Sequence, residues 1–348
     1  MFLLSTKTFK CTFSLSGATW FKTSYTFSCC RSTLATAGAI DPVEYCTNFV
    51  QKYDYEAYLI GQFWPKEVRG PYFALKAFSA ELAMIQDNVS NSSIGMMRMQ
   101  FWRDATKALN DVRVKPRSGT CLAGNPPAHP IALALHQASI KANLPTYHFK
   151  RIIDARVCTH PNHLDPKDAE LQAPVHLTVD SLTAHSESTS STVLYLLLSL
   201  LSLPSSTLSH AASHLGAAQT FTTLLRALPF HAKNGRMVLP AEITAKHGVV
   251  QEEVFRRGPA AKGLDDAVFE FATVANDHLA TARSMFHQEG FGGKVPWEAM
   301  PVFLAGVPVS SILKQVEEVN FDVFHPRMQT RDWKLPWRIW KGYYQQRF

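Results

Sequence analysis

The chain has 348 residues, of which 46% are hydrophobic and 18% are charged, and its formal net charge is +7. This length and composition exclude a fibrous chain, a disulfide-stapled miniprotein and a wholly disordered protein, because the apolar content is ample for a core. No uninterrupted apolar run reaches the roughly 18–20 residues that span a bilayer.

Residues 1–40 have the composition of a mitochondrial presequence. They contain 14 serine and threonine residues, four basic residues and no acidic residue. A positive segment without acids is drawn inward by a membrane potential that is negative inside, and this one lacks the compact apolar stretch of a secretory signal. We therefore expect residues 1–40 to be a cleaved presequence and residues 41–348 to form the folded domain. The alternative is a disordered tail.

Past residue 40 the chain is nearly neutral, with 31 basic against 28 acidic residues. This balance gives no electrostatic attraction to nucleic acid, so we expect no nucleic-acid partner. Cysteine usage predicts no disulfide framework, because Cys46, Cys121 and Cys158 are far apart and odd in number.

The sequence past residue 40 predicts helices throughout, with almost no alternation of the strand type. The run from Pro71 to Val89 is apolar on nearly every face, which is typical of a helix at the centre of a domain. Further helices are expected over 94–109, 130–143, 176–203, 206–228, 264–288 and 297–319. Joints rich in proline and glycine lie at 116–130, 158–174, 229–240 and 290–296. We therefore expect one all-α domain, a bundle of many helices.

One of these joints contains residue types that bind metal. Cys158, His160, His163 and Asp165 are ligand types at short spacing, and zinc is one interpretation of them. No second Cys/His pair lies nearby, so we expect a solvated loop and no metal site.

The C-terminal stretch RDWKLPWRIWKGYYQQRF combines aromatic and basic residues. If Pro336 begins a helix, its spacing places Trp337, Trp340 and Tyr344 on one face, while Arg338 and Lys341 line the neighbouring face. This combination suits a membrane surface with anionic headgroups, and these five residues are the candidate membrane contacts. The alternative is that the tryptophan face packs on the bundle.

Two blocks of the sequence resemble the squalene/phytoene synthase family. In the first, Tyr53–Ala105, the shared residues are Asp54-Tyr55, Tyr58-Leu59, Pro65, Arg69, Phe73-Ala74-Leu75, Ala77-Phe78, Glu81-Leu82-Ala83, Asp87 and Arg98-Met99-Gln100-Phe101-Trp102. The second is His214–Val249. The resemblance extends over roughly residues 44–345 and is weak over 157–190, where His185–Ser191 replaces a tyrosine-rich helix. Within the family, the chain looks most like the branch of mitochondrial complex I assembly factors.

The resemblance implies an isoprenoid-synthase-like bundle with a central cavity. The enzymes of the family hold Mg²⁺ and a prenyl diphosphate between two Asp-x-x-x-Asp motifs, because carboxylates at i and i+4 of a helix point the same way. The matching positions here are Ala83 and Asp87 in the first motif, and Ala227 and His231 in the second. One carboxylate of four remains, and Pro229 inside the second motif is expected to kink its helix.

We therefore expect no catalytic, cofactor-binding or metal-binding residues. The resemblance implies a non-catalytic assembly factor for mitochondrial respiratory complex I, peripheral to the inner membrane on its matrix side. Its implied partners are complex I subunits or assembly intermediates and the anionic lipid of that membrane. The candidate contacts of a relict cavity or of a partner are Asp87, Arg98, Gln100, Arg226 and His231. The alternatives are a prenyl diphosphate-condensing transferase with a rearranged metal site, and a lipid- or isoprenoid-binding protein.

Overall fold

Every regular element among the described residues is a helix, as the sequence predicts. The computed structural model describes residues 41–88, 92–111, 127–142, 144–158, 176–288 and 292–348. The presequence expected over 1–40 lies outside these ranges, as do His160, His163 and Asp165 of the zinc interpretation. The all-α prediction is confirmed for the described part of the chain.

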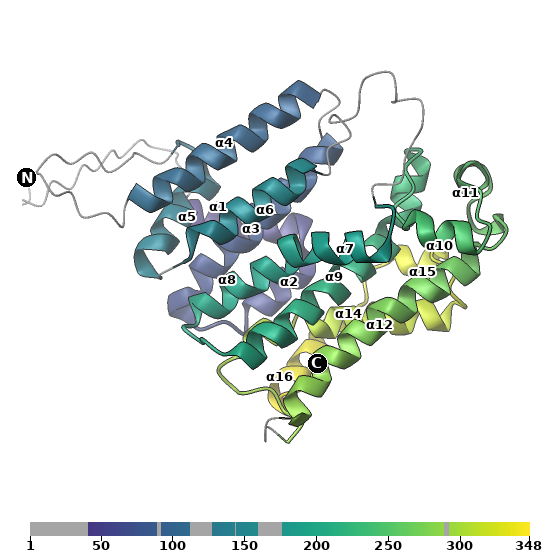
Figure 1. The fold of residues 1–348 in the computed structure, drawn as a ribbon. Coiled ribbons are helices and arrows are strands. Elements are labelled where there is room, and N and C mark those ends of the chain that lie inside the picture. Colours follow the sequence, from purple (N-terminus) through teal and green to yellow (C-terminus); the bar gives the residue numbers. More distant parts are fainter. Residues whose placement is uncertain (1–40, 89–91, 112–126, 143, 159–175, 289–291) are drawn as a thin grey trace, which may run out of the picture. The chain divides into compact units, whose positions relative to one another are not determined.

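Figure 1 shows the helices in chain order. In the first half of the chain they are α1 (Pro42–Tyr53), α2 (Tyr55–Gly61), α3 (Lys66–Asn88), α4 (Ser92–Asp111), α5 (Pro130–Lys141) and α6 (Thr146–Cys158). The middle contains α7 (Val179–Ser186), the π-helix η2 (Glu187–Ser191), α8 (Thr192–Leu200) and α9 (Ser206–Lys233). The last part contains α10 (Ala241–Lys246), α11 (Gln251–Arg257), the 3₁₀-helix η3 (Gly258–Ala260), α12 (Leu264–Gln288), α13 (Met300–Phe303), α14 (Gly306–Glu318), α15 (Pro326–Gln329) and α16 (Leu335–Gln345).

Helix α3 is central to the first half of the bundle, as its apolar sequence predicts. It packs against α1, α5 and α8. Its Phe78 is buried and makes edge contacts with Trp102 of α4 and Phe149 of α6, at 5.3 and 5.5 Å between ring centroids. Buried aromatic side chains of this kind contribute strongly to a core. This cluster fixes the position of α3, which carries Ala83 and Asp87.

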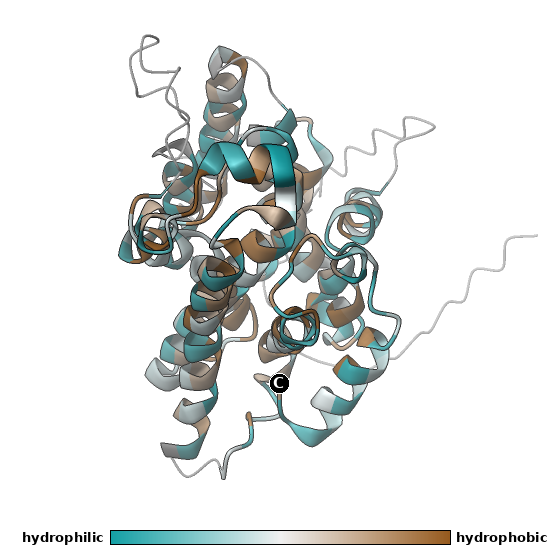
Figure 2. Cartoon of the chain, turned by 90° about the vertical axis from the view of Figure 1, so that its right-hand side faces the viewer, coloured by the Kyte–Doolittle hydropathy of each residue, from teal (hydrophilic) through white to brown (hydrophobic). Residues whose placement is uncertain are grey.

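Helices α9 and α12 lie side by side. Each of them packs in one hydrophobic core along part of its length and in a second hydrophobic core along the rest. The first core joins α1–α6 and α8 to the start of α9 and the end of α12, and the second joins the rest of α9 and α12 to α10, α11 and α14. Brown and teal stretches alternate along the helices in Figure 2, as in amphipathic helices that bury one face. The second motif position, on α9, therefore lies where the helix packs in the second core.

Several expected helix limits are wrong. The helix expected to end at residue 228 continues through Pro229 to Lys233, because burial of Leu228 and Ala232 in the second core compensates for the hydrogen bond that proline removes. The helix expected over 176–203 is divided by η2, and the one expected over 297–319 is divided into α13 and α14. Pro308 has no amide hydrogen to continue a helix, so it lies in the first turn of α14.

Candidate functional site

A cavity of about 690 Å³ lies among α1, α2, α3, η2, α8, α9 and α14, with residues 328–332 and Leu335 on one side. Ala83 of α3 and Ala227 of α9 both line it. The two positions that the family pattern pairs therefore belong to one cavity. Each presents a methyl group, which offers no atom that binds a cation or a phosphate.

The carboxylates in the described lining of this cavity are each paired with a base. The pairs are Asp54 with Lys76 at 3.2 Å, Glu56 with Arg226, and Asp332 with Arg338 at 2.8 Å. Asp54 also accepts a hydrogen bond from the Ala57 amide at 3.0 Å and caps α2. These pairs connect α2 to α9 and the start of α2 to α3, so they hold the walls of the cavity together.

The lining does not fit a magnesium–diphosphate site. Mg²⁺ needs several oxygen ligands in near-octahedral geometry, and the carboxylates available are engaged by bases. Two further cations, Lys52 and Arg331, lie over the rings of Tyr53 and Tyr55 at 4.9 and 4.7 Å. Across the residues that the structure describes, no three histidine, cysteine or acidic side chains converge as metal ligands.

Asp87 and His231 lie near each other beside this cavity. Asp87, at the end of α3, pairs with Arg236 at 2.8 Å. Burial lowers the pKa of His231, and the Asp87 carboxylate partly offsets this effect. The His231 Nδ1 atom is buried and has no hydrogen-bond partner within the described residues. A direct ion pair thus connects α3 to the turn after α9.

Removal of either charge of the Asp87–Arg236 pair is expected to lower the free energy of unfolding by about 1 kcal/mol or less, since both side chains are more than a third exposed. Asp87→Asn and Arg236→Gln, alone and combined, give the coupling energy from urea unfolding. Glu252→Gln with Arg256→Gln, an exposed pair within α11, is the matched control. A coupling energy of several kcal/mol would contradict the prediction that this pair is exposed and contributes little to stability.

Arg98 and Gln100 do not join this cluster. Both are exposed on α4, and neither lies among the described residues that line the cavity. Gln100 donates a hydrogen bond to Asp104 at 3.0 Å. Of the five candidate contacts, the structure places Arg226 in the lining, Asp87 and His231 beside it, and Arg98 and Gln100 apart on α4.

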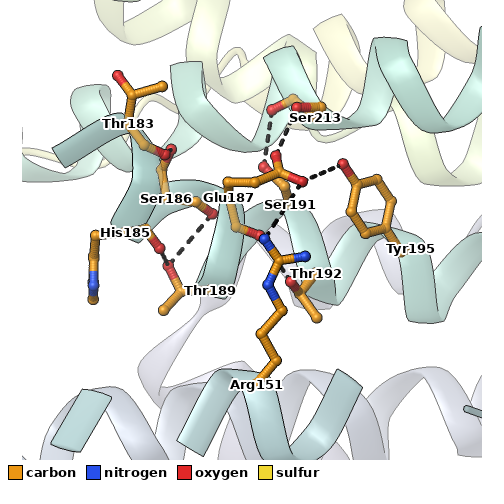
Figure 3. A network of polar contacts seen from close by, with 10 residues as sticks. All are labelled: Arg151, Thr183, His185, Ser186, Glu187, Thr189, Ser191, Thr192, Tyr195 and Ser213. Atoms are coloured by element: carbon orange, nitrogen blue, oxygen red, sulfur yellow. Dashed lines mark hydrogen bonds and ion pairs between the residues drawn. The ribbon is translucent and has the colours of Figure 1, made fainter. Parts of the chain in front are cut away.

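A second polar cluster surrounds Glu187 of η2 (Figure 3). The Glu187 carboxylate accepts hydrogen bonds from the Tyr195 hydroxyl at 2.7 Å and from the Ser213 hydroxyl at 2.6 Å. Arg151 reaches the same carboxylate from α6, at 3.9 Å. Burial, together with the hydrogen bond to Glu187, raises the pKa of Tyr195 to about 12, so its hydroxyl remains a donor. The cluster joins α6, η2, α8 and α9. Its only signal in the sequence is the departure from the family pattern at 185–191.

The candidate membrane contacts on α16 form an exposed aromatic face. Pro336 lies in the first turn of α16, and Trp337, Trp340 and Tyr344 are 64%, 44% and 59% exposed. The alternative in which these side chains pack on the bundle does not agree with this exposure. Lys341 is exposed on the neighbouring face.

Arg338 differs from the expectation that it belongs to a free basic face. Its guanidinium pairs with Asp332 at 2.8 Å and contacts the Ser311 hydroxyl of α14. It therefore attaches α16 to the bundle. Among the described residues, no helix combines the length and apolar character needed to cross a bilayer.

Comparison with known proteins gives consistent matches over most of the chain. Residues 50–340 match the family model described as squalene/phytoene synthase. Complex I assembly factor 6 of Rattus norvegicus is 37% identical over 320 residues, which are 91% of this chain and 87% of that protein. The protein of the same name from Homo sapiens is 37% identical over 308 residues, which are 88% and 84% of the two chains.

The fold is also similar to a solved enzyme structure. Squalene synthase HpnC from Alicyclobacillus acidocaldarius superimposes with a TM-score of 0.62, over 81% of this chain and 95% of that chain. The two sequences are 14% identical, so this similarity concerns the fold alone.

Proposed function

The chain belongs to the squalene/phytoene synthase family, and from this membership we propose that it is a non-catalytic assembly factor for mitochondrial respiratory complex I. The relatives named complex I assembly factor 6 support the assembly role, since the matches extend over most of both chains. The cavity lining carries the non-catalytic part of the proposal: Ala83 and Ala227 line it, and its carboxylates are held in ion pairs.

The same lining explains in chemical terms why prenyl transfer is not expected. Diphosphate leaves a prenyl chain only when its negative charge is neutralised. In a metal-dependent site, cations that are bound by carboxylates neutralise this charge. Ala83 and Ala227 have no ligand atoms, and the described lining carries four basic against three acidic side chains, which disfavours a divalent cation. The family fold remains, and the chain acts by binding other proteins.

We place this activity on the matrix side of the mitochondrial inner membrane, with the chain peripheral to the bilayer. The acid-free basic composition of residues 1–40 supports import, and the exposed aromatic face of α16 supports contact with lipid. The partners we propose are complex I subunits or assembly intermediates, together with anionic lipid of that membrane.

Deletion of the gene is expected to remove fully assembled complex I from native gels and to leave the other respiratory complexes in place. Reintroduction of the wild-type chain restores complex I, whereas a chain in which Lys7, Lys10, Lys22 and Arg31 are changed to glutamate is not imported and does not restore it. Unchanged complex I in the deletion strain would refute the assembly role.

The purified chain is expected to release no diphosphate from farnesyl or geranylgeranyl diphosphate with Mg²⁺ or Mn²⁺. The reason is the absence of ligand atoms at Ala83 and Ala227. A heat-denatured sample of the same chain is the control. Diphosphate release above that control, lost in Asp87→Ala, would show an enzyme with a rearranged metal site.

A further inference from the structure

Helix α16 carries apolar side chains on two opposite faces. Leu335 and Ile339 are 6% and 0% exposed, and they lie on the side of α16 that packs against α14. At about 100° per residue, Trp337, Trp340 and Tyr344 point roughly the other way. The bundle therefore covers one apolar face of α16 and leaves the aromatic face to the outside.

The exposed face continues onto a second segment of the chain. Trp297 lies 4.6 Å from Tyr343 and 6.3 Å from Tyr344 between ring centroids, and it is 45% exposed. Within α16, Trp337 stacks on Trp340 at 4.7 Å, and Trp340 lies 4.9 Å from Tyr344. We call Trp297, Trp337, Trp340, Tyr343 and Tyr344 the aromatic patch. The sequence did not predict the contribution of Trp297, because 40 residues separate it from Trp337.

Basic side chains accompany the aromatic patch. Lys341 lies one turn from both Trp337 and Tyr344 on α16 and is exposed. Lys334, just before α16, lies 5.3 Å from the ring of Trp333, which is 82% exposed. Residues 331–348 contain five basic residues and one acid, and this acid, Asp332, is paired with Arg338. The stretch thus presents positive charge with no free carboxylate to oppose it.

We infer that the aromatic patch docks on the surface of a bilayer that contains anionic lipid, an inference that rests on the proposed placement at the inner membrane. Tryptophan and tyrosine favour the level of the headgroups, and lysine beside them attracts anionic lipid. Interfaces between proteins also favour aromatic residues but are depleted in lysine. Lys341 next to the aromatic face and Lys334 beside Trp333 therefore favour lipid over a protein partner.

Co-sedimentation of the full chain with vesicles tests this inference. Wild type is expected to pellet with phosphatidylcholine vesicles that contain cardiolipin, less so in high salt, and weakly with phosphatidylcholine alone. Lys334→Glu with Lys341→Glu lowers the partition coefficient at least about tenfold. Trp337→Gln with Trp340→Gln lowers it as well, without a shift of the melting temperature, because both rings are exposed. Arg338 is kept in every variant, since it attaches α16 to the bundle.

The matched control is Lys233→Glu with Lys262→Glu, which makes the same charge change at exposed positions outside α16. It is expected to pellet as wild type does. Equal pelleting of the patch variants and wild type would overturn the inference, and loss of complex I in cells that carry such variants would then indicate a protein partner at the patch. Loss of vesicle binding in the patch variants supports docking on lipid, whatever the gene deletion shows. The vesicle experiment can therefore refute the docking inference, and the gene deletion can refute the assembly role, independently of each other.

Discussion

Acidification from pH 7 to pH 4.5 is expected to lower the free energy of unfolding by about 2–3 kcal/mol through His148 alone. Burial, assisted by the charge of Arg151, lowers the pKa of His148 from 6.5 to about 4. Below pH 6.5 the unfolded chain therefore binds a proton that the folded chain does not bind. Stability falls as the pH decreases, until the folded pKa is reached. His185, whose pKa burial lowers to about 3, adds in the same direction.

Urea unfolding between pH 7.5 and pH 4.5 measures this dependence. His148→Leu removes the titrating ring, which is 6% exposed and has a buried Nδ1 without a described hydrogen-bond partner. The variant should show a shallower decline with falling pH than wild type. His287→Gln, at an exposed position, should decline as wild type does. An equal decline in wild type and His148→Leu would show that this histidine is not the cause.

The helices that the sequence predicts well are those with a long apolar run. Helix α3 was expected from Pro71 and begins at Lys66, and its Phe78, Leu82 and Ile85 are buried. Helices α10 and α11 have 6 and 7 residues and no apolar periodicity of their own. Helices this short are marginal in isolation, so packing in the second core and not local sequence stabilises them. The periodicity of apolar residues in the sequence does not predict that packing.

The candidate site follows a similar division. The family pattern identified Ala83 and Ala227, and the structure brings both into one cavity. The family pattern did not identify the ion pairs, because their partners are remote in sequence. Arg226 and Glu56 are 170 residues apart, and Arg236 and Asp87 are 149 residues apart. A count of motif positions shows which residues have been lost. It contains no information on which charges replaced them.

The segment 185–191 shows the opposite case, in which a departure from the family pattern marks a structural feature. Within the segment, the Thr189 hydroxyl donates to the His185 carbonyl at 2.8 Å. The Ser191 hydroxyl donates to the Ser213 carbonyl of α9 at 2.9 Å. Residues 187–191 form the π-helix η2, and Ser190 lines the cavity. Single turns of π-helix are frequent at functional sites. Here the turn also brings Ser191 against Gly216 of α9.

Gly216→Ala is expected to lower the free energy of unfolding by about 1–3 kcal/mol, although alanine favours a helix over glycine by up to about 1 kcal/mol. A Cβ at Gly216 would lie 2.5 Å from the Cα and N atoms of Ser191, which are backbone atoms and cannot turn aside. For the same reason Ser191→Ala should not rescue the variant. Gly70→Ala in α3 is the matched control, because its Cβ would meet only Val43 side-chain carbons, the nearest at 3.3 Å, and these can adjust. Thermal and urea unfolding of the three variants separate these effects. If the Gly216→Ala chain were as stable as the Gly70→Ala chain, α9 and η2 would not be in close contact. This contact joins the Glu187 cluster to the wall of the cavity.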